Sequence, residues 1–260
     1  MASAKRQLIS LVTGASSGFG AEICRRLVSD GHRVIAAGRR MERLIALQQE
    51  LGGPETVHVL PIDVRDRAAT EAMVSGLPVS WQEIDVCVNN AGLALGLEPA
   101  DKANLDDWDI MVDTNVKGLM YVTRACLPGM MARNRGHIIN IGSTAAEFPY
   151  PGGNVYGATK AFVYQFTLNL RADLVGSMVR VTDIEPGMSG GTEFSNVRFK
   201  GDDEKAAAVY KDTITSPLTA VDVADTVSYV ASRPAHVNIN SIQLMPVCQA
   251  FGPFNIKRKA

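Results

Sequence analysis

Thr13-Gly14-Ala15-Ser16-Ser17-Gly18-Phe19-Gly20 stands between a short apolar run, Leu8 to Val12, and a stretch with apolar residues at helical spacing. Glycines here let the chain turn tightly and bring backbone N–H groups close to a pyrophosphate, beside the positive end of a helix. The spacing G-x-x-x-G-x-G differs from the commoner G-x-G-x-x-G, and an ordinary strand-to-helix turn is the alternative. Its position between a first strand and a first helix favours a phosphate-binding loop in which Gly14 and Ser16 to Gly20 contact a nucleotide.

Short apolar runs alternate with longer amphipathic stretches along the whole chain. The predicted strands are at 8–12, 33–37, 56–62, 84–88, 137–141, 179–184 and 239–244. The predicted helices are at 18–29, 41–51, 67–77, 106–133, 155–175 and 220–232. Such alternation implies parallel strands joined by right-handed crossovers, with helices on both faces. We therefore predict an α/β fold, a single-domain, Rossmann-type, doubly wound parallel sheet of about seven strands, over residues 1–260.

Composition and charge exclude several classes of protein. The chain has 260 residues, of which 46% are hydrophobic, and a net charge of −1 from 26 basic and 27 acidic side chains. This balance argues against a nucleic-acid partner, and the run Lys257-Arg258-Lys259 is too short to change that. No apolar stretch approaches the ~20 residues that span a bilayer, and the first apolar run is too short for a signal peptide. We expect a soluble, cytoplasmic protein with no membrane partner.

The cysteines and histidines show no arrangement typical of a metal site or a disulfide framework. The four cysteines, at positions 24, 87, 126 and 248, form no CxxC pair and have no histidine at metal-ligand spacing. The four histidines are scattered over predicted turns and strand starts, and none has an acidic partner at a useful spacing. We expect reduced cysteines, structural histidines and no metal.

The end of the second predicted strand indicates which nucleotide the loop would bind. An acidic residue about twenty positions after a glycine-rich loop favours NAD, because it accepts hydrogen bonds from the ribose hydroxyls. This chain has Gly38-Arg39-Arg40 at that position. A planar guanidinium suits a ribose 2′-phosphate, so Arg39 and Arg40 indicate NADP(H). The alternative is that both arginines are solvated charges at the start of a helix.

Tyr156 and Lys160 are four residues apart and share one face of a predicted helix. A phenol has a pKa near ~10 and is a poor base at neutral pH, but a nearby ammonium lowers that pKa. Ser143 follows the fifth predicted strand, at the edge where doubly wound sheets bind ligands, so its hydroxyl can donate to a substrate oxygen. Asn115 is disfavoured inside a helix and calls for a specific role. The pair alone is weak evidence, because a surface tyrosine beside a solvated lysine is the alternative.

In this order and spacing, the motifs resemble the short-chain dehydrogenase/reductase family from end to end. The matching motifs are the glycine loop, Asp63-Val64, Asn89-Asn90-Ala91-Gly92, Asn115, Ser143, Tyr156 with Lys160, and Pro186-Gly187 with Thr192.

The resemblance implies a role for each of these motifs. Tyr156 would be the acid/base, Ser143 would orient the substrate oxygen, and Lys160 would bind the nicotinamide ribose and lower the pKa of Tyr156. Asn115 would hold a water that continues the proton path. The cofactor would also contact Asp63 and Val64 at its adenine, Asn90, Ala91 and Gly92 at its ribose side, and Pro186, Gly187 and Thr192 at its carboxamide end.

The segment 188–216 follows the nicotinamide-binding motif and has no long apolar run, so we predict a lid over the reacting carbon. Within the family, Glu185 to Asp202 resembles the lid of the NADP-dependent 3-hydroxy acid dehydrogenases, which act on serine, allo-threonine and malonic semialdehyde. We expect Ser143, Tyr150 and Arg198 to contact the substrate, with Arg198 paired to a carboxylate. The alternative is that Arg198 is a solvated charge balancing the acidic residues that follow it.

These inferences predict an NADP(H)-dependent oxidoreductase that interconverts a small 3-hydroxy acid and its carbonyl form, with Tyr156 as acid/base. Two alternatives stay open: a reductase of sulfoacetaldehyde or another small aldehyde or ketone, and a non-catalytic NADP(H)-sensing protein. The resemblance also implies a homotetramer, or else a dimer, that pairs through the long helices at 106–133 and 155–175. Both helices carry more apolar residues than one buried face needs, namely Met111, Val112, Met120, Tyr121, Phe162, Val163, Phe166 and Leu170.

Overall fold

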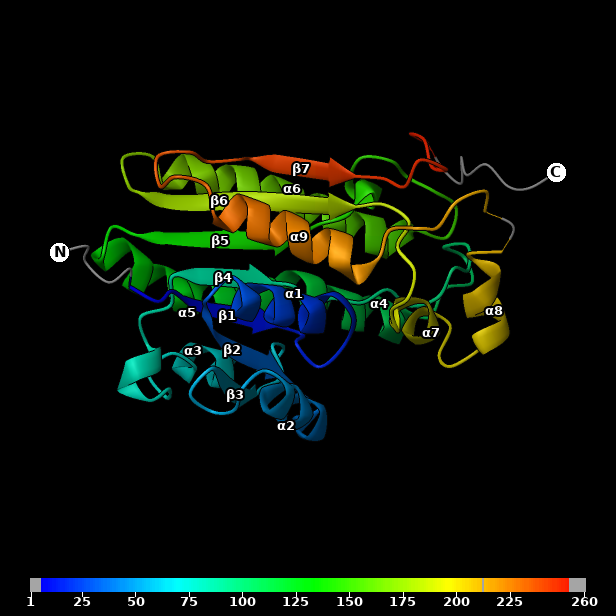
Figure 1. Cartoon of the computed structure of the whole chain (residues 1–260). Helices are drawn as coiled ribbons and strands as arrows, with labels where there is room; N and C mark the ends of the chain where they lie inside the picture. Colours follow the sequence, from blue (N-terminus) through cyan, green and yellow to red (C-terminus); the bar gives the residue numbers. More distant parts are fainter. Residues whose placement is uncertain (1–5, 212, 253–260) are drawn as a thin grey trace.

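The computed structural model describes residues 6–211 and 213–252. Seven parallel strands form one sheet in the order β3-β2-β1-β4-β5-β6-β7 (Figure 1), which confirms the predicted doubly wound sheet. The strands are β1 (Ile9–Thr13), β2 (Arg33–Gly38), β3 (Val57–Pro61), β4 (Val86–Asn89), β5 (Gly136–Ile141), β6 (Val179–Pro186) and β7 (Ser241–Leu244). The basic run 257–259, both ends of the predicted 1–260 domain and position 212 of the predicted lid lie outside the described residues.

Helices cover both faces of the sheet (Figure 1). One face carries α1 (Gly18–Ser29), α2 (Met41–Glu50) and α9 (Ala220–Ala231). The other face carries α3 (Arg67–Ala72), α5 (Leu119–Ala132) and α6 (Asn154–Asp173). The remaining helices are α4 (Leu105–Val112), which precedes α5 in the chain, and α7 (Phe194–Arg198) and α8 (Asp203–Ala208), which lie between β6 and α9.

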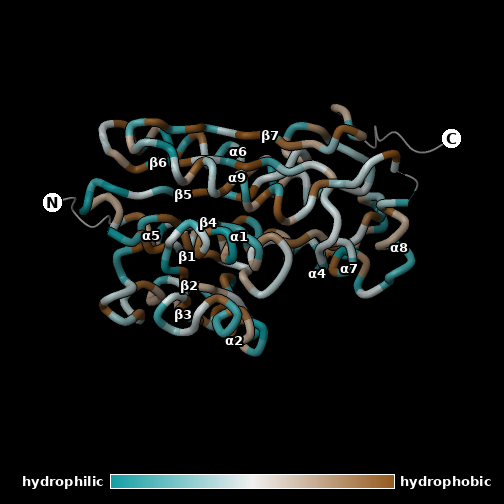
Figure 2. Tube along the Cα trace, viewed as in Figure 1, coloured by the Kyte–Doolittle hydropathy of each residue, from teal (hydrophilic) through white to brown (hydrophobic). Residues whose placement is uncertain are grey.

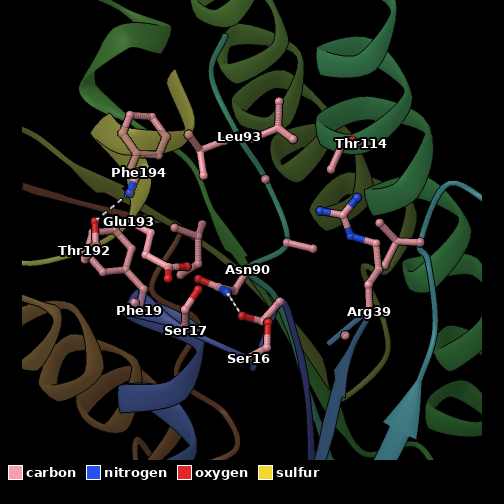
Figure 3. Close-up of a pocket in the computed structure, with 18 of the residues that line it drawn as sticks. Ser16, Ser17, Phe19, Arg39, Asn90, Leu93, Thr114, Thr192, Glu193 and Phe194 are labelled. Carbon is pink, nitrogen blue, oxygen red and sulfur yellow. Dashed lines mark hydrogen bonds between the residues drawn. The ribbon is translucent and has the colours of Figure 1, made fainter. Parts of the chain in front are cut away.

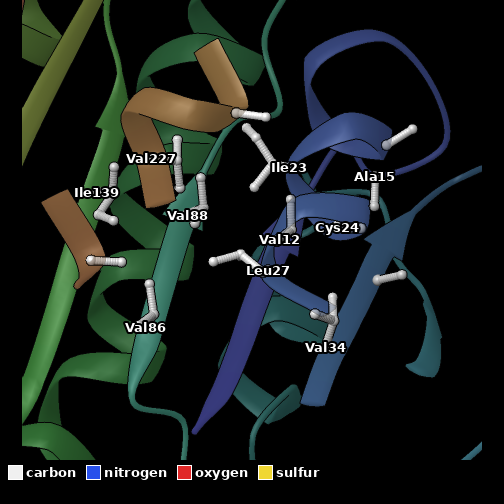
Figure 4. Close-up of a cluster of buried hydrophobic side chains, with 14 of the residues drawn as sticks. Val12, Ala15, Ile23, Cys24, Leu27, Val34, Val86, Val88, Ile139 and Val227 are labelled. Carbon is white, nitrogen blue, oxygen red and sulfur yellow. The ribbon is translucent and has the colours of Figure 1, made fainter. Parts of the chain in front are cut away.

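Each face of the sheet buries its own apolar core. Val12 packs with Ile23 of α1 and Val227 of α9 on one face (Figure 4), whereas Leu11 packs in the cluster that contains Met130 of α5 on the other. Neighbouring residues of a strand point to opposite faces, so Leu11 and Val12 belong to different cores. Figure 2 shows hydrophobic residues along the strands and hydrophilic ones in outer helices and loops.

Three predicted elements differ from those observed. The long helix predicted at 106–133 is interrupted by η2 (Asp113–Gly118), a π-helical stretch between α4 and α5. The helix predicted at 67–77 ends at Ala72, and its last residues form turns around Gly76. The polar segment 188–216 is not a continuous loop, because it contains α7 and α8. Within the described residues, no helix combines the length and apolar character needed to cross a membrane.

The order of the strands places a crevice at the centre of the sheet. From β1 the chain continues to β2 and β3 on one side, whereas β4 to β7 lie on the other side. The loops that follow β1 and β4 therefore diverge at their carboxyl ends, which is where doubly wound sheets bind their ligands. The glycine loop follows β1, and residues 90–92 follow β4, so both reach this crevice.

Candidate active site

The glycine loop is fixed against the segment that follows β4. Gly14 (φ +67°) adopts the left-handed conformation, and a Cβ on it would stand 2.9 Å from Asn90 Nδ2, so no side chain fits there. Thr13 Oγ1 accepts hydrogen bonds from the backbone N–H groups of Asn90 and Ala91, at 3.0 Å each. Ser17, the N-cap residue of α1, places no side-chain oxygen on the first N–H groups of the helix. Those N–H groups are therefore left to bind an anion such as a phosphate.

This loop forms one wall of a cavity of about 290 Å³, here called the loop cavity (Figure 3). Gly20 lies buried beneath the loop, and Asp63 at the rim is ion-paired with Arg65 at 2.6 Å, which lowers the pKa of the Asp63 carboxyl. Pro186 and Gly187 line a second cavity instead. The other predicted cofactor residues all line the loop cavity: Gly14, Ser16, Ser17, Gly18, Phe19, Arg39, Arg40, Asp63, Val64, Asn90, Ala91, Gly92, Tyr156, Lys160 and Thr192.

The two predicted ribose-phosphate arginines differ in what they already contact. Arg40 donates from Nε to Ser16 Oγ (3.0 Å) and from Nη2 to Ser17 Oγ (2.6 Å), and it pairs with Glu193 at 2.8 Å. Arg39 makes no hydrogen bond or ion pair with any residue in the described part of the chain, and Figure 3 shows it across the cavity from Glu193. Arg39 is therefore the arginine whose guanidinium is free for a phosphate.

Tyr156 of α6 is 8% exposed and lines both the loop cavity and the second cavity. Ser143 follows β5 and accepts a hydrogen bond from Ala145 N at 3.1 Å, which holds its hydroxyl beside the tyrosine. Burial raises the pKa of Tyr156, and the Ser143 hydroxyl and the Arg198 guanidinium act against this rise. The sequence predicted that Lys160 would lower this pKa, but in this structure the Lys160 ammonium is turned toward the Ile141 carbonyl instead.

Lys160 is buried behind the tyrosine. Its Nζ donates to Ile141 O at 2.7 Å and lies 5.9 Å from the centre of the Tyr156 ring. Burial lowers the pKa of Lys160 to about 8, and the charge of Asp183 opposes that decrease. Asp183 is fully buried on β6, and neither of its side-chain oxygens has a hydrogen-bond partner among the described residues. Burial and the neighbouring Glu185 raise the pKa of Asp183 well above its usual range, and the charge of Lys160 opposes that rise.

Asn115 lies in the π-helical stretch η2 and is buried. Its Nδ2 donates to Leu93 O (2.8 Å) and to Thr159 Oγ1 (3.0 Å), and its Oδ1 accepts from Leu93 N (2.9 Å). The side chain thus connects η2, the segment after β4 and α6. Because both N–H groups and the oxygen have protein partners, a water held here would depend mainly on other groups. π-Helical turns are frequent at functional sites, and this one explains a mid-helix asparagine.

A second cavity of about 250 Å³, here called the Tyr156 cavity, lies on the other side of the tyrosine. The Arg198 side chain enters this region: Nη2 donates to the Tyr150 hydroxyl, and Cζ lies 5.3 Å from the centre of the Tyr156 ring. Arg198 is partly buried and makes no ion pair with an acidic side chain among the described residues, which disagrees with a solvated counter-charge for the acidic residues after it. The structure therefore brings Ser143, Tyr150, Tyr156 and Arg198 together, as the sequence predicted for the substrate site.

Three further residues of the site were not predicted. Phe194 lines both cavities and packs edge-on against the Tyr156 ring, with 5.8 Å between centroids. Gln249 closes the Tyr156 cavity and accepts from Met188 N at 2.7 Å. Glu193 joins the loop cavity to the start of α2. Each acts through contacts with distant parts of the chain, which leave no local motif in the sequence.

Metal chemistry has no evident ligand set in this part of the molecule. Among residues 6–211 and 213–252, no group of three or more His, Cys, Asp or Glu side chains is arranged to hold a metal ion. The four cysteines, all within these ranges, are free and buried.

Comparison with known proteins agrees with this geometry. A profile of the short chain dehydrogenase family matches residues 9–203. The NADP-dependent 3-hydroxy acid dehydrogenase of Salmonella typhi is 63% identical over 251 residues, covering 96% of this chain and all (100%) of that protein. The serine 3-dehydrogenase of Rhizobium radiobacter is 51% identical over 250 residues, with 96% and 98% covered. A solved structure of the closed form of serine dehydrogenase complexed with NADP⁺ matches with a TM-score of 0.91 and 60% identity, over 97% of this chain and 100% of that one. The chain belongs to the short-chain dehydrogenase family.

Proposed function

We propose that this protein is an NADP(H)-dependent oxidoreductase that interconverts a small 3-hydroxy acid and its carbonyl form. The observation that carries the proposal is the place of Tyr156: its ring stands between the loop cavity and a cavity that holds a partly unpaired guanidinium. The names of two relatives support the substrate class, because one is called an NADP-dependent 3-hydroxy acid dehydrogenase and the other a serine 3-dehydrogenase.

The residues of the loop cavity suit a phosphate-bearing cofactor. The uncapped start of α1 supplies N–H groups for a pyrophosphate, and Arg39 supplies an unpaired guanidinium for a ribose 2′-phosphate. NADP(H), when bound, supplies or accepts the hydride. Lys160, buried at the inner end of the cavity, would bind the nicotinamide ribose and hold a positive charge beside the tyrosine.

Tyr156 would transfer the proton. In the reductive direction the Tyr156 hydroxyl gives its proton to the carbonyl oxygen as that carbon gains a hydride, and Ser143 donates a hydrogen bond to the same oxygen. In the oxidative direction the phenolate takes the proton back from the alcohol. Burial raises the pKa of Tyr156, and Ser143 and Arg198 oppose this rise, so these two groups favour the phenolate.

Arg198 would select the substrate. Its Nε atom is buried without a hydrogen-bond partner among the described residues, although it lies beside the cavity that Tyr156 faces. A buried N–H of a charged group is costly unless an acceptor pairs with it, and a substrate carboxylate would pair with it. A sulfonate has the same charge, so a reductase of sulfoacetaldehyde is the second candidate supported by the same atom.

The remaining assignments concern the whole molecule. The protein is one catalytic domain with a lid at 188–216, and it works in the cytoplasm, in keeping with its free, buried cysteines. It forms a homotetramer through α4–α5 and α6, supported by half-buried aromatic side chains on α6, Phe162 and Phe166, whose rings stack 5.7 Å apart.

Steady-state rates across a panel of substrates test the proposal. The panel is malonic semialdehyde, sulfoacetaldehyde and succinic semialdehyde with NADPH and with NADH, and L-serine with NADP⁺. We expect a strong preference for NADPH and for a three-carbon carboxylate, and a loss of at least ~10²-fold in Tyr156→Phe with cofactor binding retained. A Tyr156→Phe variant within tenfold of wild type would remove Tyr156 from the mechanism. Absence of NADPH consumption on every carbonyl would favour a non-catalytic, cofactor-sensing protein.

A further inference from the structure

A carboxylate in the predicted lid joins two walls of the loop cavity. Glu193 directly precedes α7; its Oε2 accepts from Arg40 Nη1 at 2.8 Å, and its Oε1 accepts from Arg43 Nη1 at 2.6 Å. Arg40 in turn holds the Ser17 hydroxyl of the glycine loop at 2.6 Å. A continuous series of contacts therefore runs from the lid, through the start of α2, to the phosphate-binding loop. Figure 3 shows Glu193 and Ser17 on the same side of the cavity.

The other end of α7 is attached as well. Lys200 Nζ pairs with Asp107 Oδ2 of α4 at 2.8 Å, and Gly96 N donates to Arg198 O at 2.9 Å. A helix of five residues cannot form stably by itself, so such contacts decide where it lies. The segment that carries Phe194 and Arg198 to the tyrosine is thus held between one ion pair near α4 and one ion-pair cluster near the cofactor loop.

The ion-pair cluster of Glu193, Arg40 and Arg43 lies at the wall of the loop cavity. Ser17, Arg40 and Glu193 line the loop cavity, whereas Arg43 does not and acts only on Glu193. The two arginines hold the pKa of Glu193 at about 2, so the carboxylate stays charged at physiological pH. Arg39, across the cavity, remains unpaired and can hold a ribose phosphate while the cluster is intact.

We propose that Glu193, Arg40 and Arg43 form a latch that closes the lid over bound NADP(H) and limits how fast the cofactor dissociates. The inference rests on the proposed cofactor, and it assigns to Glu193 and Arg43 a positioning role that is separate from phosphate recognition. Ligand that lies on the glycine loop is enclosed by the latch and leaves when the latch opens. Exposed ion pairs are individually weak, so the latch should slow dissociation about three- to tenfold.

Stopped-flow displacement of NADPH, followed by the loss of its fluorescence, measures the dissociation rate directly. Glu193→Gln and Arg43→Gln each remove one side of the latch. Glu42→Gln is the matched control, because it removes one acidic charge from the first turn of α2 and makes no hydrogen bond or ion pair with any described residue. We expect about three- to tenfold faster dissociation in both latch variants and no change in the control. The double variant should be no faster than the faster single variant, and added salt should accelerate the wild type more than the latch variants.

Several results would overturn the latch. Dissociation of NADPH from Glu193→Gln at the wild-type rate would do so, as would a rate equal to that of the Glu42→Gln control. Slower dissociation would mean that Glu193 competes with the cofactor phosphate for Arg40 rather than closing over it. Fully additive effects in the double variant would show that Glu193 and Arg43 do not act as a pair. Wild-type protein that binds no NADPH would refute the proposed function together with the latch, whereas normal binding with no response to Glu193→Gln refutes the latch alone.

Discussion

Single side chains carry most of the chemistry at the site, and two side chains there have buried polar atoms without a partner among the described residues. The Nε of Arg198 and both oxygens of Asp183 are buried without hydrogen bonds to described residues. Such atoms are costly in a folded protein, so they persist where a ligand or a counter-charge compensates for them. For Asp183 the counter-charge is Lys160, whereas for Arg198 the proposed partner is the anionic end of the substrate.

Arg198→Ala separates a substrate clamp from a packing role. If Arg198 pairs with the substrate anion, the substitution should lower kcat/KM for malonic semialdehyde, which corresponds to a loss of ~2–4 kcal/mol of transition-state binding. The kcat/KM for a neutral aldehyde of similar size should hardly change. Steady-state kinetics on both substrates, with Lys205→Ala as a control for a lid charge outside the cavity, give the answer. Equal losses on charged and neutral substrates would mean that Arg198 only shapes the lid.

At the scale of helices and strands, the strands and the long helices were predictable, and the short helices were not. The strand from Ile9 to Thr13 and the helix from Gly18 to Ser29 match their predicted positions closely, because their apolar spacing reflects burial against the sheet. Helices α7 and α8 were missed, since five or six residues contain too little periodicity and their positions depend on contacts such as Lys200 with Asp107. The π-helical stretch at Asn115 was also beyond reach: a hydrophobic pattern gives no sign of one inserted residue.

The site shows the same limit. The spacing of Tyr156 and Lys160 predicted that they share a helix face, and the resemblance to a family supplied their expected roles. Glu193 could not, because its partner Arg40 is 153 positions away along the chain. The contact of the Lys160 ammonium with the Ile141 carbonyl was likewise unpredictable, since spacing on a helix does not fix where a long side chain points its ammonium.

Strand β5 makes the stability of the sheet sensitive to acid. His137, the second residue of β5, is buried and bonded through Nε2 to Thr182 Oγ1 at 2.8 Å, and burial holds its pKa well below the usual 6.5. The unfolded chain takes up a proton near pH 6.5 and the folded chain does not, so the free energy of unfolding falls below that pH, by up to ~1.4 kcal/mol per unit.

Thermal unfolding between pH 8 and pH 5 tests this acid sensitivity. His137→Gln, which can keep the bond to Thr182, should flatten the decrease in Tm below pH 6.5. His58→Gln serves for comparison, because burial also lowers the pKa of that partly exposed histidine. The contribution of His58 to the decrease in Tm should be smaller. An unchanged slope in His137→Gln would assign the acid sensitivity to other groups.

For the whole molecule, the doubly wound parallel sheet could be predicted from the alternation of strands and helices, but the proposed assembly depends on which apolar side chains the fold leaves at the surface. Of the apolar residues predicted to be in excess, Met111, Val163 and Leu170 are buried in the chain's own cores. The prediction that these three residues are free for contact between subunits is therefore wrong. The half-buried side chains left for the proposed contact between subunits include Met120 and Tyr121 at the start of α5 and Phe162 on α6.

Light scattering at micromolar concentration should show a homotetramer. Phe162→Glu places a charge among the half-buried rings of α6 and should shift the population to smaller species, whereas Gln165→Glu, on an exposed position of the same helix, should not. A wild-type monomer would contradict the assembly, and an unaffected Phe162→Glu tetramer would move the interface away from α6.

Because Thr192 and Phe194 line both cavities, the two binding events share one wall. A cofactor that orders this wall reduces the conformational entropy that the protein loses when the substrate binds. The two affinities then become cooperative without any contact between the distant ends of the ligands. We therefore expect each ligand to bind more tightly to protein that already holds the other, which titration calorimetry with and without the second ligand measures. Thermodynamic linkage then requires reciprocity: a 3-hydroxy acid that binds more tightly to the holoenzyme must strengthen retention of the dinucleotide by the same factor.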